Sequence, residues 1–318
     1  MRKRLVIAAQ LALAALVIWL VVDTLGPHWN EVGGRLTSLR PRWIPLIVAS
    51  LLVLSTHALL VQTWRSVLRA WSSPLPFIDA ARVWSVSNLA RFLPGPVWQI
   101  GAMGALARRE GASAVAAAGS SIIIAIVNVL VGFAIVFATG ARVLDAGING
   151  GIVAGVLATT VALIAVVSLP IVVPWATRTA ARITKRPLTV IAVPPRIIWI
   201  TAAGTGAQWL IYGVAFKLFC TSLLGDAATG GALPYLAVYT SAYLVGYVTL
   251  VAPGGLVVRE AAITAGMTSF GLATLPDALF VAVASRLWLT LLEVTPGLLF
   301  LAAGAATRPP QLRKDVSS

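Results

Sequence analysis

Long apolar stretches separated by short polar loops dominate the pattern of the chain. About 20 consecutive apolar residues are enough to cross the hydrocarbon core of a bilayer as one α-helix. Six stretches meet this requirement, at residues 5–25, 43–61, 112–140, 151–175, 197–218 and 276–303. The pattern therefore predicts an all-α polytopic membrane protein with six full spans.

A further apolar region, residues 77–111, does not fit a simple span. Charged residues interrupt its front half, and Pro94 and Gly95 break the uncharged part that follows Arg91. That uncharged part would reach only about 24 Å as a helix, against a hydrocarbon core of about 30 Å. We interpret it as a re-entrant hairpin that enters and leaves on the cytoplasmic side. Two amphipathic surface helices are the alternative.

A second broken region lies at residues 234–271, where Pro253, Gly254 and Gly255 separate two apolar arms. Non-helical backbone at membrane depth is tolerated only where protein or a water-filled cavity satisfies its polar groups. This region is either a re-entrant hairpin from the outer face or a pair of true spans, which would raise the number of spans to eight.

The two halves of the chain then show the same order of segments with opposite starting orientation. Residues 5–145 and 150–304 each give two spans, a broken hairpin and a further span. Inverted repeats of this kind underlie many secondary transporters, whose substrate sites lie at broken helices near the midplane. We therefore expect one transmembrane domain over residues 1–304, followed by a short cytoplasmic tail over residues 305–318.

Composition and charge agree with this architecture. Mean hydropathy is +0.92 and only 11% of residues are charged, against about a quarter in soluble globular proteins. The formal net charge of +14 does not indicate nucleic-acid binding, because the chain has no hydrophilic domain that could present a basic face. Instead, most Lys and Arg fall in loops on one side, which by the positive-inside rule places both termini in the cytoplasm. We expect a multi-pass protein of a bacterial-type plasma membrane.

Enzyme chemistry has little support in the sequence. No nucleotide-binding or nucleophile motif is present, and Cys220 is the single cysteine. His28 and His57 have no matching ligand set, so neither a metal site nor a cofactor is predicted. We expect a protein that is not an enzyme.

Charged residues inside apolar segments are the candidate functional residues, because charges at membrane depth are costly and usually functional. Arg259 and Glu260 follow the break at residues 253–255, and Arg91 precedes the break at Pro94 and Gly95. Arg286 and Glu293 lie seven residues apart in the last predicted span and so on one helix face. We predict that these five residues bind a lipid headgroup, an anionic one in particular. Structural ion pairs are the alternative.

Lone polar residues within the predicted spans receive a different interpretation. Asn128, His57 and Gln208 each stand among apolar neighbours. Such groups commonly form hydrogen bonds between membrane helices, and we assign them that role.

At these same residues the chain resembles the transmembrane region of lysylphosphatidylglycerol synthases, a flippase-type membrane domain. The matching pieces are residues 91–95 (Arg-Phe-Leu-Pro-Gly), 252–256 (Ala-Pro-Gly-Gly-Leu), 258–262 (Val-Arg-Glu-Ala-Ala) and 285–288 (Ser-Arg-Leu-Trp). Two positions depart from the family's pattern. Val257 stands where a glycine is usual, and Pro96 stands where a basic residue often follows.

The resemblance implies a membrane domain that moves a lipid between leaflets. In the family's namesakes a separate cytoplasmic domain makes that lipid, an aminoacylated phosphatidylglycerol; we expect no such domain here. The sequence thus predicts a translocase for a phospholipid or a polyprenyl-linked lipid, with a lipid synthase or glycosyltransferase as possible partner. The alternative functions are a membrane-embedded transferase and an accessory or scaffold protein.

Overall fold

The computed structural model describes residues 40–92, 97–143, 150–184, 193–248 and 258–306, and all regular structure in these ranges is helical. Short 3-10 turns, η2 (Ala90–Phe92) and η3 (Gly225–Ala227), follow two of the α-helices. The α-helices are α3 (Trp43–Ala70), α4 (Phe77–Leu89), α5 (Val97–Arg109), α6 (Ala114–Val143), α7 (Gly150–Thr184), α8 (Pro195–Leu224), α9 (Ala232–Val248), α10 (Val258–Ser269) and α11 (Leu275–Ala306).

Five of these helices, α3, α6, α7, α8 and α11, are long and apolar enough to cross a membrane. They coincide with five of the six stretches predicted from the sequence, so those predictions are confirmed. The helix predicted at residues 43–61 continues to Ala70. The remaining stretch, residues 5–25, lies outside the described residues.

The two broken regions form pairs of short helices. α4 and α5 have 13 residues each, and α9 and α10 have 17 and 12. At 1.5 Å per residue none of them spans the full hydrocarbon core of about 30 Å. We call α4, η2 and α5 the first hairpin and α9 and α10 the second hairpin. The predicted breaks themselves, Pro94 with Gly95 and Pro253 with Gly254 and Gly255, lie outside the described residues.

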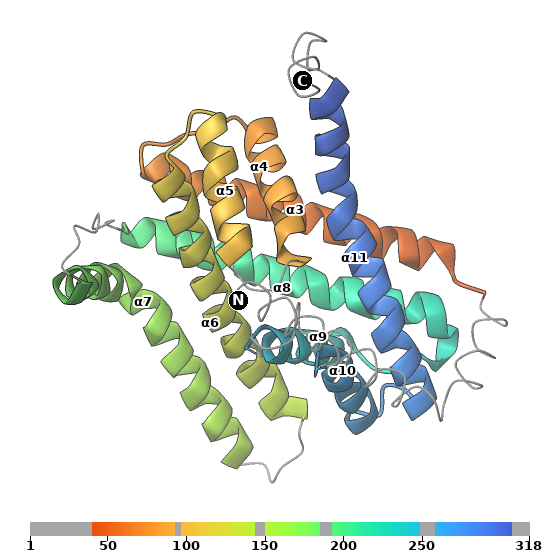
Figure 1. The fold of residues 1–318 in the computed structure, drawn as a ribbon. Helices are drawn as coiled ribbons and strands as arrows, with labels where there is room; N and C mark the ends of the chain where they lie inside the picture. Colours follow the sequence, from red (N-terminus) through yellow and green to blue (C-terminus); the bar gives the residue numbers. More distant parts are fainter. Residues whose placement is uncertain (1–39, 93–96, 144–149, 185–192, 249–257, 307–318) are drawn as a thin grey trace, which may run out of the picture.

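α3 and α8 pack along one another more extensively than any other pair of helices. Figure 1 shows these two helices crossing the middle of the molecule, with the first hairpin on one side and the second hairpin on the other. α6 packs against α5 and α9, while α11 packs against α4 and α10. Each of these two long helices therefore contacts both hairpins.

Small residues allow the close approach of the helices, as is usual in membranes. A Cβ atom at Gly213 of α8 would lie 2.7 Å from Leu236 of α9. A Cβ atom at Gly297 of α11 would lie 2.8 Å from the backbone oxygen of Ser85 in α4 and 2.9 Å from Leu89. Glycine at these positions keeps each hairpin tight against its neighbouring span.

The starts of α6 and α11 are capped in a similar way. The Ser113 hydroxyl accepts a hydrogen bond from the Ala116 backbone N–H at 3.3 Å. The Thr274 hydroxyl accepts one from the Asp277 backbone N–H at 3.4 Å and donates to the Asp277 carboxylate at 2.8 Å. Side-chain acceptors at these positions satisfy N–H groups that have no partner within the helix.

Candidate functional site: a central polar cavity

The end of α4 brings the first of the predicted charges to the middle of the molecule. The helix ends at Leu89, and the 3-10 turn that follows carries Arg91. Its Nη1 donates a hydrogen bond to Glu293 Oε2 of α11 at 2.9 Å. The arginine side chain is 33% exposed and the glutamate 18%. This charge-assisted bond joins the first hairpin to the last long helix.

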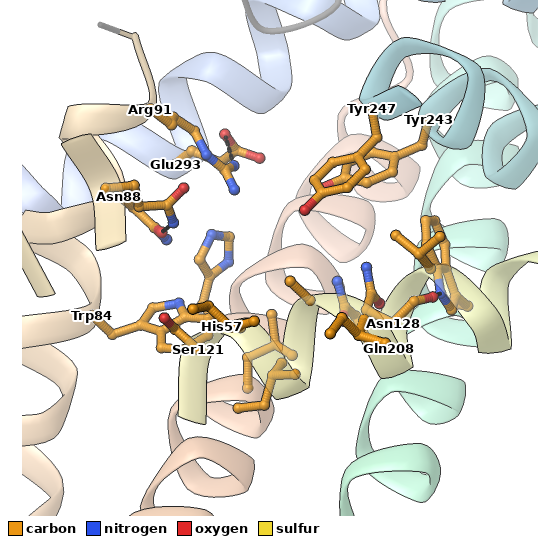
Figure 2. A pocket seen from close by; sticks show the side chains of 18 of the residues that line it. His57, Trp84, Asn88, Arg91, Ser121, Asn128, Gln208, Tyr243, Tyr247 and Glu293 are labelled. Carbon is orange, nitrogen blue, oxygen red and sulfur yellow. Dashed lines mark hydrogen bonds and ion pairs between the residues drawn. The ribbon is translucent and has the colours of Figure 1, made fainter. Parts of the chain in front are cut away.

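The pair opens onto a cavity of about 580 Å³, which is within the usual range for small-molecule sites. We call it the central cavity. Figure 2 shows polar side chains directed into it from several helices. Its described polar and aromatic lining residues are His57, Trp84, Asn88, Arg91, Gln99, Ser121, Asn128, Gln208, Trp209, Tyr212, Tyr239, Tyr243, Tyr247 and Glu293.

Amide side chains occupy two parts of the cavity wall. In the first hairpin, Gln99 Nε2 of α5 donates to Asn88 Oδ1 of α4 at 2.6 Å and so connects its two arms. In α6 and α8, by contrast, the buried oxygens Asn128 Oδ1 and Gln208 Oε1 have no hydrogen-bond partner in the described part of the chain. The prediction that these two residues bond to neighbouring helices is therefore wrong for their side-chain oxygens, which are buried in residues of the cavity wall.

His57 of α3 also lines the cavity. Its Nδ1 lies 3.0 Å from the carbonyl oxygen of Val53 in its own helix. A carbonyl can only accept, so Nδ1 donates the hydrogen of this bond. The predicted role of His57 in a bond between helices is thus replaced by a bond within α3.

Aromatic rings form the wall supplied by α8 and α9. The rings of Tyr212 and Tyr239 stack at a centroid distance of 5.1 Å, and those of Tyr243 and Tyr247 stack at 6.3 Å. Trp209 meets Tyr243 edge to face at 5.1 Å. We call these five residues the aromatic wall.

Arg259, at the start of α10, packs against this wall. Its guanidinium carbon lies 5.4 Å from the ring centre of Tyr239 and 5.8 Å from that of Tyr243. The residue is only 8% exposed, and its Nε and Nη2 have no hydrogen-bond partner among the described residues. Arg259 thus contacts two rings that line the cavity without being one of its described lining residues.

The remaining two predicted charges lie close to each other. Glu260 Oε1 of α10 is 3.9 Å from Arg286 Nη1 of α11, and the two side chains are 19% and 21% exposed. This distance is too long for a hydrogen bond. The second hairpin is therefore connected to α11 by a looser ion pair than the first.

Comparison with known proteins places the chain in a family. Residues 7–297 match the model of the lysylphosphatidylglycerol synthase TM region. The chain belongs to this family. No curated protein and no solved structure matches it.

For this family member, the structure divides the five predicted site residues into three groups. Arg91 and Glu293 meet at the central cavity, Glu260 and Arg286 form a separate pair, and Arg259 lies on the aromatic wall. The sequence reasoning did not identify the aromatic wall or the amides as site residues. A signal was present, since tyrosines recur every fourth residue along α9, at positions 235, 239, 243 and 247.

Proposed function

We propose that this protein moves a lipid between the leaflets of its membrane, with the polar headgroup passing through the central cavity. The observation that carries the proposal is the Arg91–Glu293 pair, which joins the first hairpin to α11 at the cavity wall. A polar lining inside a bundle of apolar helices can bind a substrate that itself carries a polar group. Lipid chains would remain among the exposed apolar faces of the long helices while the headgroup crosses.

The packing of the helices supports an alternating-access arrangement. If residues 5–145 and 150–304 are inverted repeats, α3 corresponds to α8, and α6 corresponds to α11. The contact of α6 with α5 and α9 then corresponds to the contact of α11 with α10 and α4. We infer that both short-helix pairs are re-entrant hairpins around one central site, as in transporters built from inverted repeats.

Arg91 is the group that would receive an anionic headgroup. An entering phosphate competes with Glu293 for the guanidinium, whose fork of N–H donors suits phosphate oxygens. Departure of the phosphate is assisted when the carboxylate re-forms its bond to Arg91. A lipid synthase or a glycosyltransferase on the cytoplasmic side would supply the lipid.

The test is leaflet exchange in proteoliposomes that contain fluorescently labelled phosphatidylglycerol. We expect Arg91→Gln to weaken headgroup binding and Glu293→Gln to leave the phosphate on an unopposed arginine, so both variants slow exchange about tenfold or more. Arg82→Gln is the matched control. It removes the ion pair between Arg82 of α4 and Glu110 just after α5, at 3.1 Å, and neither residue lines the cavity.

Folding of each variant is checked by its elution as a single species and by its melting temperature in detergent. Exchange that is unchanged in well-folded Arg91→Gln and Glu293→Gln proteins would overturn the proposal. That result would favour the accessory or scaffold alternative, in which the ion pair only holds the helices together.

A further inference from the structure

The tyrosines of this protein have an unusual location. The chain has five in all. Four of them line the central cavity: Tyr212 of α8 and Tyr239, Tyr243 and Tyr247 of α9. The fifth, Tyr235, lies one helical turn before Tyr239 on α9. Tyrosines of membrane proteins are enriched at the two membrane–water interfaces, whereas here they gather around one internal space. The wall that they form is therefore a feature of the site.

The tyrosine rings stack in two nearly parallel pairs, and Tyr247 is 47% exposed. The planes of Tyr212 and Tyr239 are 11° apart, and those of Tyr243 and Tyr247 are 12° apart. Figure 2 shows the Tyr243 and Tyr247 rings extending from α9 toward the cavity. Ring faces carry partial negative charge and attract the weakly positive hydrogens of C–H groups. A flat or ring-shaped group with C–H bonds on its face would pack well here.

Residues that line the same space carry hydrogen-bonding atoms without partners in the described part of the chain. Gln208 is 8% exposed, and its Oε1 is buried without a partner in the described part of the chain. The same is true of Asn128 Oδ1 and of the donor Trp84 Nε1. Buried polar atoms of this kind are normally satisfied. All three residues line the cavity, so a small rotation of these side chains would let an occupant that both donates and accepts hydrogen bonds satisfy them.

The charges around the wall argue against a cationic occupant. Among the described lining residues Glu293 is the single carboxylate, and it is already bonded to Arg91. The rings of Tyr239 and Tyr243 already contact the positive charge of Arg259. A second cation at this wall would be repelled by the first. The part of the cavity next to the wall therefore suits a neutral group.

We infer that the central cavity recognises a lipid whose headgroup carries a neutral, hydroxyl-rich unit, a sugar or a cyclic polyol, next to its phosphate. The C–H face of that ring packs on the aromatic wall, and its hydroxyls bond to Gln208, Asn128 and Trp84. The phosphate takes the Arg91 end. This assignment of a substrate class rests on the proposed function, and it separates the neutral end of the cavity from the charged end.

Two pairs of probe lipids test the inference on the full-length protein. Phosphatidylinositol and phosphatidylmethanol are both phosphodiesters with one negative charge and differ in the inositol ring. The hexosyl and methyl esters of a polyprenyl phosphate differ in the same way in the sugar. Affinity is measured by titrating each lipid into the protein in nanodiscs. We expect the hydroxylated member of at least one pair to bind about tenfold more tightly than its partner, as new hydrogen bonds to unsatisfied groups provide. Equal affinities within both pairs would overturn the inference.

Variants then assign the preference for the hydroxylated lipid to the amide side chains and to the aromatic wall. Gln208→Leu and Asn128→Leu are each expected to abolish the difference in affinity within the preferred pair. Because each amide oxygen lacks a partner in the described part of the chain, its loss should leave the melting temperature equal or higher. Thr205→Val, in α8 but outside the cavity lining, is the matched control and keeps the preference. A preference that survives both leucine variants and also Tyr243→Leu would contradict the assignment.

The outcomes separate this inference from the proposed function. Selective binding without leaflet exchange would refute translocation and retain the headgroup class. Leaflet exchange without selective binding would retain translocation and refute the headgroup class. Free myo-inositol and free hexose are titrated in parallel, and binding of either as tightly as the lipid-linked form would show a site for a soluble sugar and overturn the inference.

Discussion

The two hairpins place similar charges in different surroundings. Next to the first break, Arg91 is held by a hydrogen bond of 2.9 Å to Glu293 at the wall of the central cavity. After the second break, Arg259 lies against two tyrosine rings, and Glu260 is 3.9 Å from Arg286. An arginine beside a proline–glycine break is therefore not enough to define a headgroup contact.

The difference comes from the helices that surround each break. α4 carries Asn88 one residue before its end, and Asn88 lines the cavity together with Arg91. α9 carries a tyrosine at every fourth position, and two of these rings cover the guanidinium of Arg259. The side chains on the preceding helix decide whether an arginine at a break faces the cavity or packs within the protein.

The largest effect on the first hairpin is expected from a substitution at Gly297, which lies one turn beyond Glu293 on α11. A Cβ atom there would lie 2.8 Å from the Ser85 backbone oxygen, so Gly297→Ala must push α4 away from α11 and lengthen the Arg91–Glu293 bond. We expect a loss of about 1–3 kcal/mol in the free energy of unfolding, as in other overpacked sites, together with slower leaflet exchange. Melting temperature and exchange rate are measured side by side.

Two further glycine variants serve as references for this prediction. A Cβ atom at Gly101 of α5 would meet nothing within 4 Å, so Gly101→Ala should not destabilise the protein. At the second hairpin, the nearest atoms to a Cβ atom on Gly266 belong to the side chain of Val238, the closest at 3.0 Å. Gly266→Ala should therefore cost less than Gly297→Ala, and a Gly297→Ala protein as stable as the Gly101→Ala protein would contradict the prediction.

A smaller effect is expected from substituting Arg259, which tests whether the second hairpin's arginine only packs against the aromatic wall. A desolvated cation over an aromatic face contributes about 2 kcal/mol. A double-mutant cycle of Arg259→Met with Tyr243→Leu should give a favourable coupling of about that size or somewhat less. Exchange should persist in the Arg259→Met protein, because Arg259 supports the wall and does not line the cavity. If Arg259→Met stops exchange as fully as Arg91→Gln does, Arg259 contacts the headgroup directly, as its motif alone predicts.

The sequence was a good guide to the long helices and to the broken regions. Windows of about 20 apolar residues identify membrane helices because lipid imposes that length. Proline and glycine beside charges likewise marked the two regions that form short helix pairs. These features are local, so the sequence carries them without any knowledge of how the helices pack.

The partners of the charges could not be predicted in the same way. Arg91 and Glu293 are 202 residues apart in the chain, and nothing near either residue identifies the other. Asn128 and Gln208 were predicted to form hydrogen bonds between helices. The sequence around a lone amide in a span does not show what the amide faces. The tyrosine repeat of α9 was the missed signal. A spacing of four residues keeps side chains near one helix face, which indicates a continuous aromatic surface.

The smallest expected effect concerns the Glu260–Arg286 pair. At 3.9 Å, with both carboxylate oxygens of Glu260 lacking a hydrogen-bond partner in the described part of the chain, the interaction is charge attraction alone. A double-mutant cycle of Glu260→Gln with Arg286→Gln should give a coupling of about 1 kcal/mol or less. The same cycle for Arg91 and Glu293 should give about 1.5–3 kcal/mol, the range for hydrogen bonds to charged groups. Equal couplings would mean that the two hairpins are held to α11 equally tightly. In that case the difference between them would lie in access to the cavity, because only the first pair lines it.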